Sequence, residues 1–127
     1  MENLEFRVRW VHPESSCNGF DYFDAIDGYR QSDPCQEIIA FDQYIKRNDC
    51  HNNKLYENDI VEVVEETISH GDELIRGIIS YDDTSCQWVI NLKSESIPLC
   101  HFIDLGIEKI GNIYENEDLL EKRSRRL

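Results

Sequence analysis

The chain has 127 residues and a strongly acidic composition, with 26 acidic side chains against 13 basic ones and a net charge of −13. We expect such a chain to bind neither nucleic acid nor an anionic membrane directly, because like charges repel. No apolar run approaches the roughly 18 residues that a membrane-spanning helix needs, and the first residues lack the basic and apolar regions of a signal peptide. We therefore expect one domain, residues 1–127, that stays in a cytoplasm. Its five cysteines, widely spaced and odd in number, are then expected to be free thiols.

The first predicted element is a strand over residues 4–10, where apolar and charged side chains alternate strictly. Pro13 ends it, because proline cannot donate to a sheet ladder. The alternation predicts a half-buried strand with these side chains on its buried face: Leu4, Phe6, Val8 and Trp10.

Residues 14–36 are irregular and fit either an ordered long loop or a short hairpin, tethered by its aromatic side chains. Aspartates alternate with the aromatic residues and predict an acidic outer surface. These aspartates are Asp21, Asp24, Asp27 and Asp33.

Short apolar runs separated by turn-forming residues predict the rest of the fold. Strands are expected at residues 37–44, 60–65, 74–81, 87–92, 97–103 and 107–114. Turns are expected at Tyr56–Asp59, Ser69–Asp72 and Asp82–Ser85, and Asn52, Asn53 and Asn58 suit left-handed backbone where the chain reverses. Since no amphipathic helix separates the strands, the pattern predicts a small barrel or sandwich.

Residues 116–127 are predicted to form a terminal helix and a basic tail. Asn116 can cap the helix, acidic residues fill its first turn, and Leu119 and Leu120 would pack against the sheets. Four of the 13 basic residues lie in the tail, so residues 1–121 carry 26 acidic and 9 basic side chains, a net charge of −17.

Several groups of residues offer chemistry, but their spacing is wrong for it. Cys50-His51 and Cys100-His101 contain zinc-binding residue types, yet adjacent strand residues point to opposite faces and zinc ligands are usually two to four residues apart. The aspartates of residues 14–36 lack the register of a calcium loop. Phosphate-binding and dinucleotide motifs are absent. We expect no enzymatic activity, no cofactor and no metal.

Two runs of sequence resemble the signature of the YopX family, small proteins encoded mainly by bacteriophages and prophages. Residues 107–116, followed by Leu119 and Leu120, are similar to the family's Ile-Glu-Val-Ile-Gly-Asn-Ile-Tyr-Glu-Asn run, and Glu5-Phe6-Arg7 with Trp10 is a weaker third match. In residues 43–61 the matching positions are Gln43, Tyr44, Asp49, Tyr56, Glu57, Asp59, Ile60 and Val61. The resemblance implies a small antiparallel SH3-like, partly open β-barrel with a short C-terminal helix.

The departures from the family pattern matter too. Two family glycines fall at Asn52 and Asn58, which keeps access to positive φ. The family's Thr-Gly-Leu becomes Ile45-Lys46-Arg47, which leaves a different shape open for the first turn. Residues 11–36 match nothing in the pattern, so we treat them as the variable region in which a specialised function could lie.

The resemblance and the acidity together favour a phage-encoded interaction module, in the cytoplasm of a bacterial host cell, that binds and inhibits a host protein with a basic surface. One version is nucleic-acid mimicry directed at a host defence enzyme, of the anti-CRISPR or anti-restriction type. The proposed acidic patch contains Glu57, Asp59, Glu62, Glu65, Glu66, Asp72 and Glu73, with Asp21, Asp24 and Asp27 as a secondary acidic loop.

Plainer alternatives remain open. Glu57 and Asp59 could make turn contacts, and Glu62, Glu65 and Glu66 could protect a solvated strand edge. The acidity could serve solubility alone. The chain could also be a structural, assembly or regulatory phage protein that forms a homo-oligomer, or a metal-dependent hydrolase using His51, His70 or His101.

Overall fold

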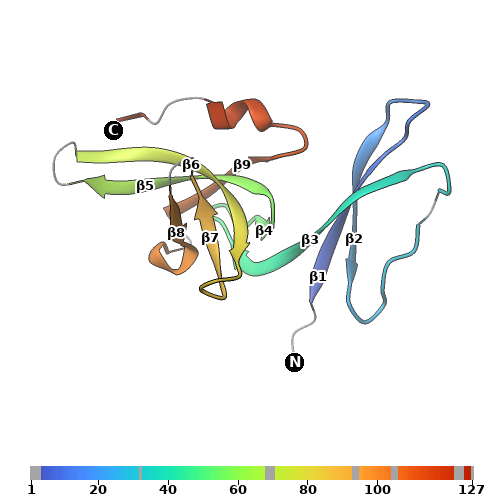
Figure 1. Cartoon of the computed structure of the whole chain (residues 1–127), viewed down its shortest axis with the longest axis horizontal. Coiled ribbons are helices and arrows are strands. Elements are labelled where there is room, and N and C mark those ends of the chain that lie inside the picture. The colour runs from blue at the N-terminus through green and yellow to red at the C-terminus, as the bar shows by residue number, and fades with distance from the viewer. Residues whose placement is uncertain are drawn as a thin grey trace. The chain divides into compact units, whose positions relative to one another are not determined.

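The computed structural model describes residues 4–31, 33–67, 71–92, 95–103, 106–121 and 125–126 (Figure 1). The fold is mainly β, as predicted, and its strands form two antiparallel sheets that are not closed. The predicted C-terminal helix is a short 3-10 helix, η3 (Glu117–Glu121). No helix within the described ranges has the length and apolar character needed to span a bilayer. By its internal contacts the chain divides into two compact units, Met1–Tyr44 (unit 1) and Ile45–Leu127 (unit 2).

Unit 1 is built on β1 (Glu5–Val11), which pairs with β2 (Asn18–Asp24) on one side and with β3 (Glu37–Asn48) on the other. Residues 14–36, predicted as a long loop or a short hairpin, contain one strand, β2, which forms its hairpin with β1; residues 25–36 then form the connection to β3. The strand order of this sheet is β2-β1-β3-β4, where β4 is Lys54–Tyr56. β2 is therefore an edge strand in the described part of the chain.

The predicted half-buried character of β1 is wrong for its charged side chains. Val8 is fully buried, but Arg7 and Arg9 are also buried, with 1% and 6% of their surface exposed, whereas Leu4 is 42% exposed. Arg7 lies opposite Asp42 of β3 in the strand register, and its Nε donates to Asp42 Oδ2 at 2.9 Å. Both guanidinium groups also lie over the ring of Phe20, at 4.6 and 5.1 Å from its centroid. Alternation alone could not reveal these partners, because they come from the neighbouring strands.

Unit 2 contains the second sheet, with the strand order β8-β7-β6-β5-β9, and β10 pairs with β6. Most predicted strands are present; residues 97–103 are the exception, because β8 ends at Pro98 and a 3-10 helix, η1 (Leu99–His101), follows. β6 already begins at Gly71, within the predicted turn Ser69–Asp72, and residues 69 and 70 of that turn lie outside the described residues. The strands are β5 (Asp59–Thr67), β6 (Gly71–Asp82), β7 (Gln87–Asn91), β8 (Ser96–Pro98), β9 (Ile107–Asn112) and β10 (Arg125–Arg126).

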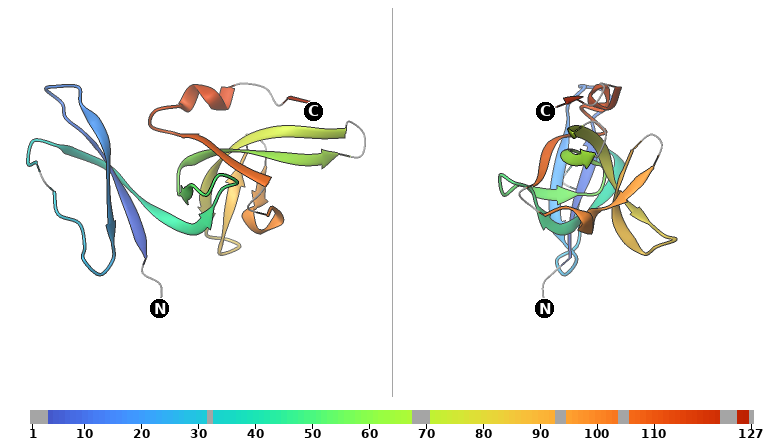
Figure 2. Two further views of the ribbon diagram at one scale, coloured as in Figure 1. Left: turned by 180° about the vertical axis from the view of Figure 1, so that it is seen from behind. Right: turned by 90° about the vertical axis from the view of Figure 1, so that its left-hand side faces the viewer.

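The main hydrophobic core lies in unit 2. Inward-facing aliphatic side chains of β5, β6, β7 and β9 supply most of it, and η3 lies beside the β5–β6 hairpin (Figure 2), where Arg76 Nη1 donates to the carbonyl oxygen of Leu119 at 3.3 Å. Burying this much apolar surface is the main stabilising contribution to the unit. The buried core residues are Ile45, Leu55, Val61, Val63, Ile75, Ile79, Ile90, Leu99 and Ile107.

Within residues 43–61, the three positions at which the resembled pattern has glycine all have left-handed backbone. Asn52 and Asn58 have φ values of 64° and 70°, which confirms the prediction made for them, and Lys46 has a φ of 63°. The backbone at Lys46 therefore keeps a conformation that glycine adopts without strain, although a lysine occupies the position.

The two strongest runs of the resembled pattern are hydrogen-bonded to each other. In the turn after β4, Asp59 Oδ2 accepts from the N–H of Tyr56 at 2.7 Å. Asn58 accepts from the N–H of Ile113 through its carbonyl oxygen at 3.1 Å and donates from Nδ2 to Tyr114 Oη at 3.2 Å. The residues at which these two runs meet therefore have a structural role in unit 2.

Asp49 provides a second connection between these runs. Its carboxylate accepts from the backbone N–H groups of His51, Asn53 and Lys109, at 3.0, 2.8 and 2.9 Å. Burial alone would raise the pKa of Asp49, but these hydrogen bonds outweigh it and hold the pKa below its ordinary value. The ionised form is thus the one that the fold stabilises.

Candidate binding site

A pocket of about 750 Å³ lies along the edge strand β2 in unit 1. Its lining consists of residues 20–23 of β2 and residues 27–30 of the connection that follows, and we call it the β2 groove. A short turn brings the two segments together: Asp24 Oδ1 accepts from the N–H of Asp27 at 2.8 Å, and Gly28 has a φ of 74°. The groove therefore lies within the variable region of residues 11–36.

Aromatic side chains support the groove. Phe23 stacks on Phe6 at a centroid distance of 5.4 Å, and it also contacts Tyr29 and Phe41, at 5.5 and 6.2 Å. Tyr22, which precedes Phe23 in β2, has a side chain that is 62% exposed. Strand residues point alternately to opposite faces, so Phe23 fixes the groove in place while Tyr22 remains accessible to a ligand.

Two of the three aspartates predicted as a secondary acidic loop line the groove. Asp21 and Asp27 are lining residues, whereas Asp24 is used in the turn. Tyr29 Oη donates to Asp21 Oδ2 at 3.2 Å, and burial together with this hydrogen bond raises the pKa of Tyr29. The phenol accordingly stays protonated and keeps its bond to Asp21. Arg30 is the basic member of the lining, so the two carboxylates outnumber it.

The residues of the larger predicted acidic patch have different environments. Asp59 is fully buried, and besides Tyr56 it faces Lys109 Nζ at 3.3 Å, so it makes the turn contact that was the alternative for it. Glu62 is paired with Arg76 at 2.8 Å. Glu57 and Glu73 are partly exposed, and the side chains of Glu65, Glu66 and Asp72 lie outside the described residues.

The strand that carries much of this patch is paired on both sides along its first part. Glu62 lies opposite Arg76 of β6 and Glu108 of β9, so the hypothesis that it protects a strand edge is wrong. The pairing with β9 ends at Val63, so the same hypothesis for Glu65 and Glu66 stays a prediction. The basic tail also adds to this sheet, since the backbone of Arg126 is in register with Glu73 of β6. Sequence spacing could not reveal either relationship, because both depend on which strands pair.

The two Cys-His doublets differ in structure. Cys50 and His51 lie in a turn after β3 rather than on a strand, so the opposite-face argument does not apply, and their ligand atoms lie with a carboxylate oxygen of Glu108 within 4.8 Å of one another. Cys100 and His101 lie in η1 and belong to no such group among the described residues. His70 is outside those residues. A second group, His12 with Asp33 and Cys35, comes from the variable region and has no sequence motif.

Comparison with known proteins identifies the family. No curated protein and no solved structure matches the chain. The family model described as YopX protein matches residues 1–121. This match spans both units, including the variable region, so the chain belongs to the YopX family.

Proposed function

We propose that this chain is a phage-encoded module that binds and inhibits a host protein, and that it holds a basic, partly apolar segment of that protein in the β2 groove. The observation that supports the proposal best is the groove itself, with the exposed ring of Tyr22 beside the carboxylates of Asp21 and Asp27. Aromatic side chains are the commonest energetic anchors of protein interfaces, and charge complementarity favours a Lys- or Arg-bearing ligand.

An edge strand supports an extended ligand. β2 has its strand neighbour, β1, on one side, and the groove lies along it. A peptide can add to such an edge as a further strand, with affinity from main-chain hydrogen bonds and specificity from side-chain pockets. The aspartates on β2 oppose pairing between copies of the chain, because like charges at an edge repel.

Family motifs elsewhere give less support for a binding role. Asp49 and Asp59 are engaged in hydrogen bonds within unit 2, which explains their presence by folding alone. The variable region carries the groove but no strong family motif, as expected if each member of a family binds a different partner.

A finer form of the proposal is that the host partner is a nucleic-acid-directed defence enzyme, of the anti-CRISPR or anti-restriction type, inhibited by nucleic-acid mimicry. The net charge of −13 supports it, since nucleic-acid-binding clefts are lined with basic residues. The burial of Asp59 and the pairing of Glu62 reduce the exposed charge of the patch first considered for this role. The groove is therefore the surface we favour.

The test is capture of host proteins by the immobilised chain, followed by hydrogen exchange on the purified complex. We expect Tyr22→Ala and Asp27→Lys to abolish capture of the partner, and residues 20–30 to gain protection in the wild-type complex. Tyr81→Ala and Asp83→Lys are matched controls, because Tyr81 is 44% exposed and Asp83 is exposed in unit 2. A partner that both groove variants retain contradicts binding through this groove.

A further inference from the structure

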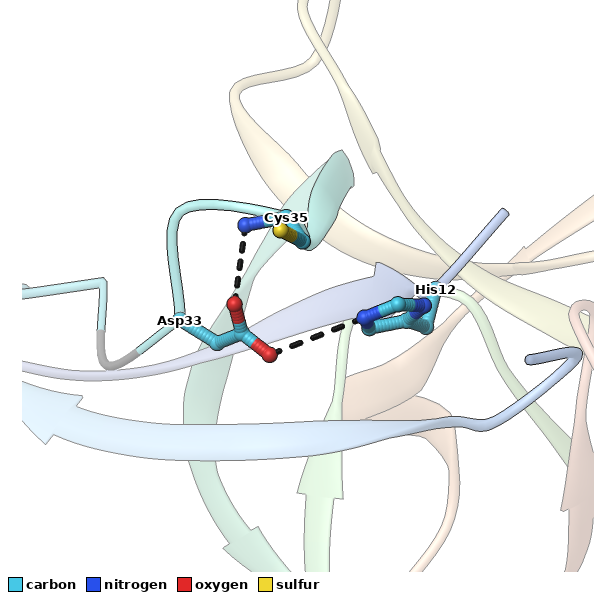
Figure 3. Close-up of side chains that lie close together, drawn as sticks. All are labelled: His12, Asp33 and Cys35. Atoms are coloured by element: carbon cyan, nitrogen blue, oxygen red, sulfur yellow. Dashed lines mark hydrogen bonds and ion pairs between the residues drawn. The ribbon is translucent and has the colours of Figure 1, made fainter. Parts of the chain in front are cut away.

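His12, Asp33 and Cys35 lie together at one end of the unit 1 sheet (Figure 3). The strand pairing explains why residues so far apart in the sequence meet. Val11, the last residue of β1, is in register with Glu37, the first residue of β3. His12 follows the first of these residues, and Asp33 and Cys35 shortly precede the second, so the antiparallel ladder delivers them to the same place.

Local hydrogen bonds fix the orientation of Asp33. Its Oδ1 accepts from the N–H of Cys35 at 2.9 Å, which closes a tight turn, and its Oδ2 is turned towards His12 Nε2 at 3.7 Å (Figure 3). The turn is reinforced by Gln31, whose Nε2 donates to the carbonyl oxygens of Asp33 and Gln36 at 2.8 and 2.7 Å. A separation of 3.7 Å is within ion-pair distance but too long for a good hydrogen bond.

We propose that His12, Asp33 and Cys35 bind a zinc ion. Zinc prefers imidazole nitrogen, carboxylate oxygen and thiolate sulfur, and these three residues supply one of each. Two ligands bound to a tetrahedral zinc at its usual N and O distances are about 3.4 Å apart, close to the 3.7 Å observed between Nε2 and Oδ2. All three ligand atoms lie within 4.8 Å of one another. The Cys35 side chain is exposed, so it can rotate to bring its sulfur to bonding distance from the zinc.

Three protein ligands leave a fourth position, which water would occupy in the isolated chain. The site would fasten the end of β1 to the start of β3, next to the end of the connection that lines the β2 groove. The proposal does not depend on the groove having a ligand. Its consequence for unit 1 is added stability in the presence of zinc, because an ion that binds the folded state alone favours that state.

The group of Cys50, His51 and Glu108 in unit 2 is the competing site in this chain. Neither a hydrogen bond nor an ion pair joins these three side chains in the described structure, whereas Asp33 already faces His12. A test must nevertheless distinguish the two groups. Single cysteine substitutions do this, because each group contains one cysteine.

The experiment uses the full chain, stripped of metal with a chelator and then titrated with zinc and with cobalt. We expect one zinc per chain in calorimetry, and a thiolate-to-cobalt charge-transfer band in the absorption spectrum. Cys35→Ser should abolish the band and weaken zinc binding by roughly 100-fold or more, since even outer-shell changes cost 10- to 100-fold. Cys50→Ser and Cys86→Ser should leave both unchanged; Cys86 is an exposed control outside either group.

The thermal transition supplies an independent readout. Zinc should raise the Tm of the wild-type chain and of Cys50→Ser, but not that of Cys35→Ser or His12→Ala. Because Cys35 is exposed, its serine variant should keep the wild-type circular dichroism spectrum without metal. A charge-transfer band that survives Cys35→Ser, a band lost only in Cys50→Ser, or a wild-type chain that binds no zinc would each overturn the proposal.

Discussion

Arg7 and Asp42 form an ion pair inside unit 1, with 2.9 Å between Nε and Oδ2 and side chains that are 1% and 0% exposed. The pair joins β1 to β3 directly across the strand register. Phe20 of β2 lies over the same guanidinium group, at 4.6 Å from its centroid to Cζ. One charged side chain thus connects all three strands of the unit.

Removing one partner of this pair should destabilise the chain strongly. Arg7→Ala leaves the buried carboxylate of Asp42 without its guanidinium partner, and such losses cost about 3–5 kcal/mol. We expect that decrease in the free energy of unfolding, measured by urea denaturation with Trp10 fluorescence. Glu62→Gln is the control, because the pair of Glu62 with Arg76 is partly exposed and should contribute at most about 1 kcal/mol.

A double variant separates loss of the pair from loss of packing. Arg7→Met with Asp42→Leu replaces both charges by apolar side chains, which is often neutral or favourable relative to a buried pair. It should therefore be more stable than Arg7→Ala alone. If the double variant is the less stable of the two, the charge pair itself is not what holds the strands together.

The positions of the strands could be predicted from the sequence, but the order of the strands in the sheets could not. The alternation of β1 and the apolar runs of β5, β6 and β7 predict strands, because the hydrophobic pattern of a strand lies within its own residues. The order of the strands in a sheet, by contrast, is not encoded in the hydrophobic pattern of any one strand. Hence the burial of Arg7 and the interior position of β5 were missed, although the residues involved were visible.

For the candidate sites as well, features local in the sequence were predicted, whereas features that depend on strand pairing were missed. The lack of any match to the family pattern indicated that a specialised function could lie in residues 11–36, and Asp21 and Asp27 of this region do line the β2 groove. Tyr22 was not identified as a site residue, since nothing local shows which aromatic side chains pack and which stay exposed. His12 and Cys35 could not be linked from sequence, because only the pairing of β1 with β3 brings them together.

Asp49 predicts a pH dependence. Its pKa is lower in the folded chain than the ordinary value of 3.8, so its contribution to stability is fully present above that value and is lost as pH falls through the folded-state pKa. We expect the wild-type chain to lose stability as the pH falls below this ordinary value. In urea denaturation, the free energy of unfolding of Asp49→Asn should depend less on pH in the acid range than that of the wild type. At neutral pH the variant should be less stable by about 2 kcal/mol, because buried N–H groups lose their charged acceptor.

Asp82 is the matched control for this experiment. Its pKa is also lowered, by hydrogen bonds from Ser85 and Thr84, but Asp82 ends β6 and these hydrogen bonds are exposed to solvent. We expect Asp82→Asn to change the pH dependence of the free energy of unfolding at acid pH much less than Asp49→Asn does. Equal effects of the two substitutions would mean that the buried hydrogen bonds of Asp49 are not the cause.

Lys46 should be sensitive to the shape of its replacement. With a φ of 63°, the backbone there suits glycine and penalises a β-branched side chain. We expect Lys46→Val to be less stable than Lys46→Gly by about 1–2 kcal/mol, in urea denaturation. The same pair of changes at the neighbouring β3 residue Ile45, which has no positive φ, provides the comparison, and there valine should be the better tolerated. Valine and glycine of equal stability at position 46 would show that the left-handed backbone is not retained.

Gly111 should not accept a side chain. A Cβ atom there would lie 2.5 Å from Asn116 Oδ1, and this same oxygen accepts from the N–H of Asn112 at 3.2 Å. Gly111→Ala should therefore destabilise the chain by about 1–3 kcal/mol through overpacking and the displaced hydrogen bond. Gly106→Ala is the control, because its nearest neighbour would be 4.0 Å away and its effect should be small. A stable Gly111→Ala chain would require Asn116 to move without cost.

The last prediction separates binding through the β2 groove from mimicry through the acidic strand. If the groove holds the partner, Tyr22→Ala should weaken the complex by roughly 30-fold, as for an aromatic anchor, and Tyr22→Phe should retain most of the affinity. Glu62→Gln and Glu73→Gln should then have little effect, and affinity should fall only moderately with salt. Mimicry reverses every one of these expectations: affinity falls steeply with salt, nucleic acid competes for the partner, and the glutamate variants lose binding while Tyr22→Ala does not. Calorimetry of wild type and variants at two salt concentrations decides between them, and the surface whose substitutions leave affinity intact is excluded as the binding site.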